Sequence, residues 1–506
     1  MLFNSYIFIL FFLPVTVSVY FLINKYQKSE NRKLDLWWLF LTSSWFYGYA
    51  NPVCLILLLL SIGVNYYVSL EINDNRKHGH LSVAKRWTIL GVVFNLALLV
   101  YFKYFEFFVS NLNQLFHQNW TLKNLVLPLG ISFFTFKQIA YIVDCYREKE
   151  QIHYHWIEYA TYVMFFPQLI SGPIGLHYEF IPQIRDEARK KIDYSNLSQG
   201  VYALALGLGK KVLIADSLSE LVAVGYANVE GLNGSSAWFV MIAYTLQIYF
   251  DFSGYSDMAL GIERMLNLDP IINFNSPYKA KTVGEFWDRW HMSLTRFFTQ
   301  YVYIPLGGSR KGKLRTYTNT MIVFLLSGFW HGANWTFVLW GFFHGFFMTI
   351  EKIVKNAWKA VFKFKISNPF FLFGGKIVGT TYTFLFVNLA WVLFRASSIE
   401  QAKTLISKLF VGGNSISTTI LEKANDLVEM RVLSRLGMES IFDMYPQLPC
   451  MLMIGGLVLG VLFMKNTQEK IEQDKYGVLR SLLTVVLIVW SVISFSDVSE
   501  FLYFNF

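Results

Sequence analysis

The sequence predicts an all-α polytopic membrane protein, and two observations carry that prediction. The first is composition, because 54% of the 506 residues are hydrophobic and only 15% are charged. A soluble globular chain usually carries about 25% charged residues, so too little polar surface remains here to surround a core of this size with water. The second is a series of long apolar windows, two of which, residues 6–23 and 52–70, contain no charged side chain. A window of about 20 apolar residues spans the hydrocarbon layer as a helix.

Similar windows recur along the whole chain. Hydropathy predicts roughly eleven membrane segments. Several are short or are interrupted by Gly, Pro or a lone charge, which favours re-entrant or buried helices at those places. After the first two, the windows lie near residues 88–102, 125–143, 159–174, 201–213, 237–259, 317–350, 377–394, 450–464 and 478–495.

The polar loops between the windows carry an excess of positive charge. The net charge is +10, which in a soluble chain would suggest nucleic-acid binding. Here Lys and Arg gather in short loops at 25–33, 76–86 and 310–315, the distribution that marks the cytoplasmic side of a membrane protein. The first window has neither a positive start nor a small-residue cleavage site, so we interpret it as a retained helix and not as a signal peptide.

We expect a single membrane domain over residues 1–506, with a motif-rich catalytic core at 250–345. Polar and ionisable residues concentrate in that core among Trp, Phe and Gly. Charged or titratable groups inside a membrane protein are costly, and they usually face a cavity and carry function.

Several kinds of site are not indicated by the sequence. There is no P-loop, no G-x-S-x-G elbow and no zinc-binding helix, so an ATP-driven pump, an α/β-hydrolase serine and a zinc protease are not indicated. The three cysteines are widely spaced without a C-x-x-C pair, and we expect them to be packing residues. His153 and His155 have no obvious third ligand, so we predict no metal site.

His331 is the strongest single candidate for chemistry. It lies in the sequence Ser-Gly-Phe-Trp-His-Gly-Ala-Asn-Trp, with apolar residues on both sides. A neutral imidazole can be buried there and act as a base at neutral pH. Gly328 and Gly332 lack side chains, and we expect them to let a substrate approach closely. The alternative is a hydrogen-bonded core histidine between helices.

His291 lies in the sequence Phe-Trp-Asp-Arg-Trp-His-Met-Ser, which reads as an amphipathic helix. Trp287, Trp290 and Leu294 would then share one stripe, while Asp288 and Arg289 face water. An aromatic belt at the membrane interface is one interpretation. A second catalytic or substrate-positioning histidine is the other.

Two further positions are less specific. His344 follows His331 by 13 residues, which is about 220° around an ideal helix, so the two would not share a face and His344 is read as packing. Asp251 belongs to a polar cluster that ends the apolar run 238–250. A carboxylate there would either orient an imidazole or cap a helix.

A family resemblance emerges from blocks that occur in order along nearly the whole chain. Each block is weak alone, and together they are specific. They lie at residues 1–5, 12–14, 44–49, 128–136, 166–174, 210–216, 250–259, 286–293, 303–308 and 501–506. With these blocks the chain resembles the bacterial membrane-bound O-acyltransferase (MBOAT) proteins, specifically the branch that contains the membrane subunit of alginate O-acetylation. One departure is Thr299-Gln300, where relatives often carry Arg-Asp.

The resemblance implies an MBOAT-type helical bundle and roles for individual residues. The family's near-universal histidine in a Trp-His-Gly setting matches His331, the expected catalytic base. A second histidine, in a Trp-His-Met-Ser setting, matches His291, which is expected to polarise the carbonyl or to position the donor. Proximity adds Asn334 and Ser327 as residues that would orient His331. Trp330 and Asp251 complete the expected substrate-positioning set.

The activity implied is acyl transfer from a cytoplasmic thioester, acetyl-CoA or another, to an extracytoplasmic hydroxyl, with no bound cofactor. The expected acceptor is a polysaccharide or cell-wall glycan, in the first place an alginate-type exopolysaccharide. The expected partners are a secreted or membrane-anchored esterase-like acetyltransferase and membrane lipid, with no nucleic acid. The expected location is a bacterial cell (inner) membrane.

Three alternatives remain open at this point. The first is transfer of D-alanine or another acyl group from a carrier protein to teichoic acid. The second is acylation of a lipid or protein. The third is a polysaccharide or lipid transporter without chemistry, although transporters more often use paired acidic residues than buried histidines.

Overall fold

The computed structural model describes residues 1–27, 33–49, 51–121, 125–148, 152–361, 368–473, 477–497 and 501–502. Within these ranges every regular element is a helix, as predicted. Positions 28–32 of the first basic loop and 503–506 of the aromatic ending lie outside the described residues.

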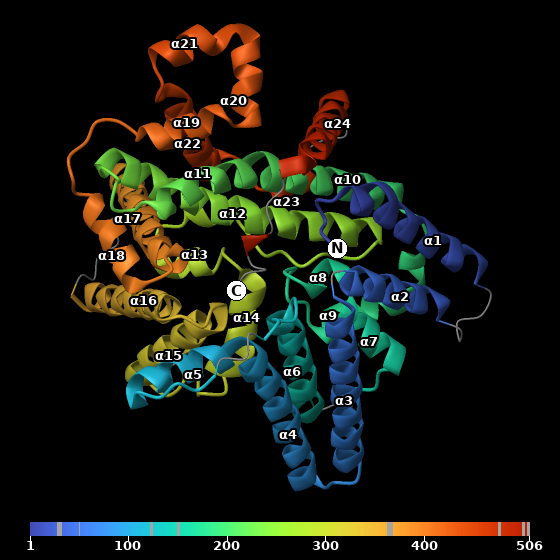
Figure 1. The fold of residues 1–506 in the computed structure, drawn as a ribbon. Helices are drawn as coiled ribbons and strands as arrows, with labels where there is room; N and C mark the ends of the chain where they lie inside the picture. Colours follow the sequence, from blue (N-terminus) through green and yellow to red (C-terminus); the bar gives the residue numbers. More distant parts are fainter. Residues whose placement is uncertain are drawn as a thin grey trace.

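The N-terminal part consists of long apolar helices. α3 and α4 form an antiparallel hairpin that turns at the lower end of Figure 1, and α6 packs against both of them. A π-helical turn, η3, continues α4 without a break and carries a lysine into the interior. The elements are η1 (Phe8–Phe12), α1 (Leu13–Tyr26), α2 (Leu34–Gly48), α3 (Pro52–Lys77), α4 (Leu81–Leu99), η3 (Val100–Tyr104), α5 (Phe105–Phe116) and α6 (Ile131–Arg147).

The middle of the chain surrounds one long helix. α12 has 32 residues and packs along α10 and α11, and these three helices cross the upper half of Figure 1. A Cβ on Gly207 of α10 would lie 2.7 Å from the Gly254 carbonyl oxygen of α12, so glycine lets the two backbones touch. The elements are α7 (Trp156–Met164), α8 (Phe166–Leu169), α9 (His177–Arg185), η4 (Glu187–Lys190), α10 (Tyr194–Leu208), η5 (Gly209–Ala215), α11 (Asp216–Ala227) and α12 (Gly234–Met265).

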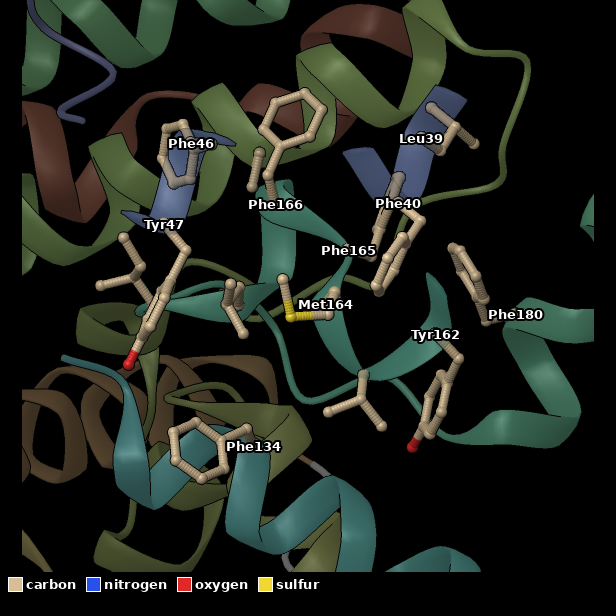
Figure 2. Close-up of a cluster of buried hydrophobic side chains, with 14 of the residues drawn as sticks. Leu39, Phe40, Phe46, Tyr47, Phe134, Tyr162, Met164, Phe165, Phe166 and Phe180 are labelled. Carbon is tan, nitrogen blue, oxygen red and sulfur yellow. The ribbon is translucent and has the colours of Figure 1, made fainter. Parts of the chain in front are cut away.

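The α7–α8 segment is buried in a hydrophobic core. Figure 2 shows Met164, Phe165 and Phe166 between side chains of α2, α6 and α9. Tyr162 keeps its hydroxyl satisfied by donating to the Gly175 carbonyl at 3.0 Å, and Tyr47 donates to the Leu129 carbonyl at 2.8 Å. Buried tyrosines usually find such partners, because an unpaired buried hydroxyl is costly.

The C-terminal half carries the motif-rich stretch and then the last apolar helices. α15 and α16 form a helical hairpin, and α17 packs beside α16. Helices α19, α20 and α21 protrude at the top of Figure 1. The elements are η6 (Pro277–Lys279), α13 (Val283–Trp287), α14 (Met292–Phe298), η7 (Thr299–Tyr303), α15 (Lys313–His331), α16 (Trp335–Val361), α17 (Pro369–Arg395), α18 (Ile399–Lys408), α19 (Thr418–Asn425), α20 (Val428–Leu433), η8 (Ser434–Met438), α21 (Glu439–Met444), α22 (Leu448–Phe463), α23 (Thr467–Gln473), α24 (Val478–Ile493) and η9 (Ser494–Asp497).

Five helices of the described chain are long and apolar enough to cross a membrane, and two shorter ones, α22 and α24, are also apolar. The multi-pass membrane character is therefore confirmed, whereas the count of roughly eleven segments is not. The window at 159–174 is divided at Phe165 into α7 and α8, which are too short to span. α12 is almost wholly enclosed by protein and carries Asp251, Asp257 and Glu263, so it is not a lipid-facing helix.

Candidate active site

The α15–α16 hairpin positions His331 as the last residue of α15. The two helices touch through glycine. A Cβ on Gly328 would lie 2.3 Å from the Phe337 carbonyl oxygen, and one on Gly341 would lie 2.3 Å from the Phe324 carbonyl oxygen. The expectation that Gly328 and Gly332 leave room for a substrate is wrong, because α16 fills that space: a Cβ on Gly332 would lie 2.2 Å from the Phe337 ring.

Aromatic rings enclose the His331 imidazole, which is only 3% exposed. Its ring centroid lies 4.8 Å from that of Trp330, 5.0 Å from that of Trp340 and 5.1 Å from that of Phe394. The Trp330 ring in turn stacks on Phe136 of α6. The predicted histidine therefore lies in a buried aromatic enclosure, where hydrogen bonds and charges act more strongly than in water.

Side chains of η3 cap the end of α15 that carries His331. The Lys103 ammonium donates to the Trp330 carbonyl at 2.6 Å, and the Tyr104 hydroxyl donates to the Phe329 carbonyl at 2.9 Å. A cation at a helix C-terminus is favoured by the helix dipole, and these donors satisfy carbonyls that have no partner within the helix. Lys103 and Tyr104 thus fix the end of the helix directly before the imidazole.

His291 lies between two short helices and not within one. α13 ends at Trp287, α14 begins at Met292, and His291 has the left-handed conformation with φ 45°. The expected continuous amphipathic helix with one stripe is therefore wrong, although Asp288 is exposed as expected. A non-glycine residue in this conformation costs about 1–3 kcal/mol and persists where the surroundings hold it.

Asn273 is what holds His291. The Asn273 Oδ1 atom accepts hydrogen bonds from the Ser293 backbone N–H at 3.2 Å and from the Ser293 hydroxyl at 2.9 Å. The His291 Nδ1 atom lies 3.2 Å from the same oxygen. A backbone N–H can only donate, so the atom that it contacts is the amide oxygen, and His291 Nδ1 must carry the proton toward it. The neutral imidazole then presents a lone pair on Nε2.

The structure brings three histidines into one aromatic cluster. The His291 centroid lies 6.2 Å from that of Trp330, which also contacts His331. His344 lies 4.8 Å from Trp340, the other neighbour of His331, and accepts a hydrogen bond from Trp287 Nε1 at 3.1 Å. His344 is buried among aromatic rings, which agrees with a packing residue, but the single-helix geometry used for it is wrong, because the chain reverses between α15 and α16 and turns His344 back toward α15.

The other residues predicted for the site lie at three different places in the structure. Ser327 is buried one turn before His331 on α15 and lines a cavity. Asn334 directly precedes α16, and its side chain accepts from the Thr336 N–H and donates to the Ser397 carbonyl. Asp251 accepts hydrogen bonds from Lys211 at 2.7 Å and from the Leu502 N–H at 3.1 Å. The hydrogen bonds of Asn334 therefore stabilise the start of α16, and those of Asp251 belong to an ion cluster with Lys211.

Sequence reasoning missed Lys103, Tyr104, Asn273 and the role of His344 in the cluster. A signal existed for Lys103, because a lone charge directly after an apolar window is a functional candidate by default. No signal singled out Asn273, which lies 18 positions before its partner in a loop whose path the sequence does not reveal.

Residues 87–392 match the family described as MBOAT, membrane-bound O-acyltransferase family. The peptidoglycan O-acetyltransferase of Helicobacter pylori is 38% identical over an alignment that covers 100% of this chain and 98% of that protein.

Two further relatives bear other names. The probable alginate O-acetylase AlgI of Pseudomonas aeruginosa is 35% identical, with 88% of this chain and 82% of that protein covered. The teichoic acid D-alanyltransferase of Bacillus subtilis is 28% identical, with 54% of this chain and 69% of that protein covered. These relatives are named as acyltransferases. The alternative of a transporter without chemistry is therefore set aside. The resemblance noted in the sequence is confirmed, and the chain belongs to the membrane-bound O-acyltransferase (MBOAT) family.

Proposed function

We propose that this acyltransferase moves an acetyl group from a cytoplasmic acyl thioester to an extracytoplasmic cell-envelope glycan, with His331 as the general base. The observation that carries the proposal is that the imidazoles of His331 and His291 both lie against the Trp330 ring. General-base assistance contributes about 10²–10⁴-fold to such reactions.

A cavity of about 250 Å³ supplies a path for the donor. It runs beside α15 from the Lys352 and Tyr303 side chains to Ser327, one turn before His331. α15 begins at Lys313, within the basic stretch 310–315, which the charge distribution assigns to the cytoplasmic side. This supports entry of the thioester from the cytoplasm, with Ser327 lining its path.

The proposed reaction at His331 is an acyl transfer from the thioester to a first acceptor hydroxyl, from which the acyl group is later passed to the glycan. The acceptor hydroxyl oxygen attacks the thioester carbonyl carbon while His331 takes the hydroxyl proton. The carbon–sulfur bond then breaks, and His331 returns the proton to the departing thiolate. The bonds and protons of this reaction balance without an oxidant, a metal or a bound cofactor.

The tautomer of His291 restricts its role. Because Nδ1–H is directed to Asn273, a neutral His291 cannot donate a hydrogen bond from Nε2 to a carbonyl oxygen. We therefore replace the expected carbonyl polarisation with another role, in which Nε2 accepts a hydrogen bond from a proton-bearing group of the donor or acceptor.

For the acceptor we favour peptidoglycan over an alginate-type exopolysaccharide. The support is the relative named a peptidoglycan O-acetyltransferase, which matches this chain from end to end at 38% identity. We further propose that the protein acts in a bacterial inner membrane and that a secreted or anchored esterase-like protein completes the transfer outside it.

The test is ester analysis of separated envelope fractions. Peptidoglycan, exopolysaccharide and teichoic acid are isolated from cells that have or lack this protein, and O-acetyl and D-alanyl esters are measured in each. Loss of O-acetyl groups from muropeptides is expected. Loss from exopolysaccharide alone would assign the alginate-type acceptor, and loss of D-alanyl esters alone would contradict acetyl transfer.

A further inference from the structure

A small polar cavity lies beside Asn273, the residue that holds His291. Its volume is about 20 Å³, which is room for one water molecule, since a buried water needs about 10–15 Å³ on this measure. α12 supplies Ser256 and Asp257 to its walls, the loop after α12 supplies Asn273, and the start of α23 supplies Thr467. Segments that lie 210 positions apart in the sequence therefore meet around one water-sized space.

Two polar atoms of the lining residues are buried and lack a hydrogen-bond partner among the described residues. They are Nδ2 of Asn273, which is 2% exposed, and Oγ of Ser256, which is 6% exposed. The Asn273 Oδ1 atom already contacts His291 and Ser293, so Nδ2 is the end of this amide that still requires an acceptor. Buried amide groups are rarely left without a partner, because their lost hydration is costly. A water in the cavity would satisfy both atoms.

A carboxylate offers such a water a further contact. Asp257 accepts hydrogen bonds from the Lys210 ammonium and from the Thr467 hydroxyl, each at 2.6 Å, and both go to Oδ2. The other carboxylate oxygen, Oδ1, is therefore available as an acceptor. A water can accept from Asn273 Nδ2–H and donate to Asp257 Oδ1, and buried waters typically make about three hydrogen bonds.

The segment between α22 and α23 also holds the loop that carries Asn273. Asn466 Nδ2 donates to Asn275 Oδ1 at 3.0 Å, and the Lys279 ammonium donates to the Met464 carbonyl at 2.7 Å. These contacts lie directly beside the start of α23, whose first residue binds the carboxylate. The loop and the carboxylate are thus fixed relative to each other across the cavity.

We propose that one bound water links Asp257 to the Asn273 amide, and that Asp257 is thereby a positioning residue for His291. The chain of hydrogen bonds runs from His291 Nδ1–H to Asn273 Oδ1, and from Asn273 Nδ2–H through the water to Asp257. An amide that donates through its nitrogen becomes a better acceptor at its oxygen, because hydrogen bonds in a chain strengthen one another. The carboxylate therefore helps to keep the proton of His291 on Nδ1. A role in catalysis rests on the acyl-transfer function proposed above.

An experimental structure of the full-length protein, at a resolution that shows ordered waters, tests the site itself. A water is expected within hydrogen-bond distance of both Asn273 Nδ2 and Asp257 Oδ1. A structure without a water in contact with both atoms would overturn the link. This measurement does not depend on activity, so it separates failure of the water site from failure of the proposed function.

Substitutions at Thr467 test the positioning role and leave the Asp257–Lys210 ion pair in place. Thr467→Val removes the hydroxyl that fixes the carboxylate and is expected to slow O-acetyl ester formation about two- to tenfold, as one lost hydrogen bond would. Thr467→Ser keeps the hydroxyl and should restore the wild-type rate. The control is Thr418→Val, since Thr418 also begins a short helix and is exposed. The rate is measured as ester accumulation in cells after induction, at matched membrane abundance.

A double-mutant cycle tests whether Asp257 acts through Asn273. Asp257→Asn removes the anionic acceptor and is expected to lower the rate about tenfold in the wild-type background. Asn273→Asp keeps the acceptor for His291 and removes the Nδ2–H donor, so in that background Asp257→Asn should cause no further loss. General structural damage would instead lower the rate by the same factor in both backgrounds.

Two activity results would overturn the inference and leave acyl transfer in place. The first is an equal loss from Asp257→Asn in both backgrounds. The second is an equal rate for Thr467→Val and Thr467→Ser. In either case His331→Ala would still abolish ester formation. Absence of O-acetyl esters from wild-type cells would contradict the proposed function, and the ordered water would then decide the link between Asp257 and Asn273.

Discussion

His291 shows how a single residue is held in a costly backbone conformation. Its left-handed backbone is maintained because Met292 N–H donates to the Asn273 carbonyl while the Asn273 side chain contacts both His291 and Ser293. One asparagine therefore sets both the backbone path and the tautomer. This makes Asn273 a positioning residue, with a role that can be separated from simple packing.

Replacement of Asn273 tests that role. Asn273→Leu removes the acceptor for His291 Nδ1–H, and a lost buried hydrogen bond of about 1–3 kcal/mol corresponds to an activity loss of about 5- to 150-fold. Asn273→Asp keeps an acceptor, so much of the activity should remain. Its carboxylate favours the protonated imidazole, so the acid limb of the pH–activity profile should move to higher pH.

The control for this series is Ser293→Ala, which removes one donor to Asn273 and leaves the His291 contact intact. It is expected to keep the wild-type pH profile. An Asn273→Leu variant with wild-type activity, or an Asn273→Asp variant with an unmoved acid limb, would show that Asn273 does not set the state of His291.

At the scale of elements, the α15–α16 hairpin decides where the histidines meet. The sequence singled out His331 and His291 through their local settings, and the structure places both against the Trp330 ring. It misplaced His344, because a helical wheel assumes one continuous helix and the chain reverses at residues 332–334. It also misread the glycines, because close packing of two helices and access for a substrate leave the same small-residue pattern.

Substitutions at two glycines test whether Gly328 is required for close packing of α15 against α16. Gly328→Ala places a Cβ 2.3 Å from the Phe337 carbonyl oxygen and is expected to destabilise the protein by about 1–3 kcal/mol. Gly63→Ala, in the interior of α3, meets no atom within 4 Å and should be neutral or stabilising, since Ala is the better helix former. Thermal unfolding in detergent measures both. Equal melting temperatures would show that the hairpin does not depend on glycine contact.

At the scale of the whole molecule, ion pairs tie distant segments together beside the membrane helices. The Glu158 carboxylate of α7 is buried and contacts Arg185 of α9 at 2.7 Å and Lys33, which precedes α2, at 2.8 Å. Burial alone would raise the pKa of Glu158, but the hydrogen bonds from Arg185, Lys33 and the His155 backbone outweigh burial and lower this pKa to about 2. The sequence did not predict this cluster, because its members are 125 and 27 positions apart.

The lowered pKa predicts a specific pH dependence. A depressed carboxyl pKa adds stability that is fully present above the ordinary value of 4.5 and is lost as the pH falls toward 2. Wild-type protein should therefore lose melting temperature between pH 4.5 and 2 more steeply than Glu158→Gln. Glu400→Gln, at an exposed position, should keep the wild-type slope. Identical slopes for wild type and Glu158→Gln would refute the contribution of this cluster.

Composition was sufficient to predict an all-helical membrane protein, because low charge and long apolar windows leave few other solutions. It was not sufficient to count the spanning helices. α12 is apolar enough to appear as a membrane segment, yet protein surrounds it almost completely. An apolar segment is removed from water equally well by burial in protein and by contact with lipid, so hydropathy does not distinguish the two.

The central claim, that His331 is the base for O-acetyl transfer, is tested most directly by the O-acetyl ester content of envelope glycan at matched membrane abundance of each variant. Cells with His331→Ala or His331→Gln should fall to the level of cells that lack the protein, because general-base catalysis of about 10²–10⁴-fold is removed. Cells with His78→Ala, which changes an exposed loop histidine, should keep wild-type ester levels. Wild-type ester levels in the His331 variants would contradict the assignment of the base.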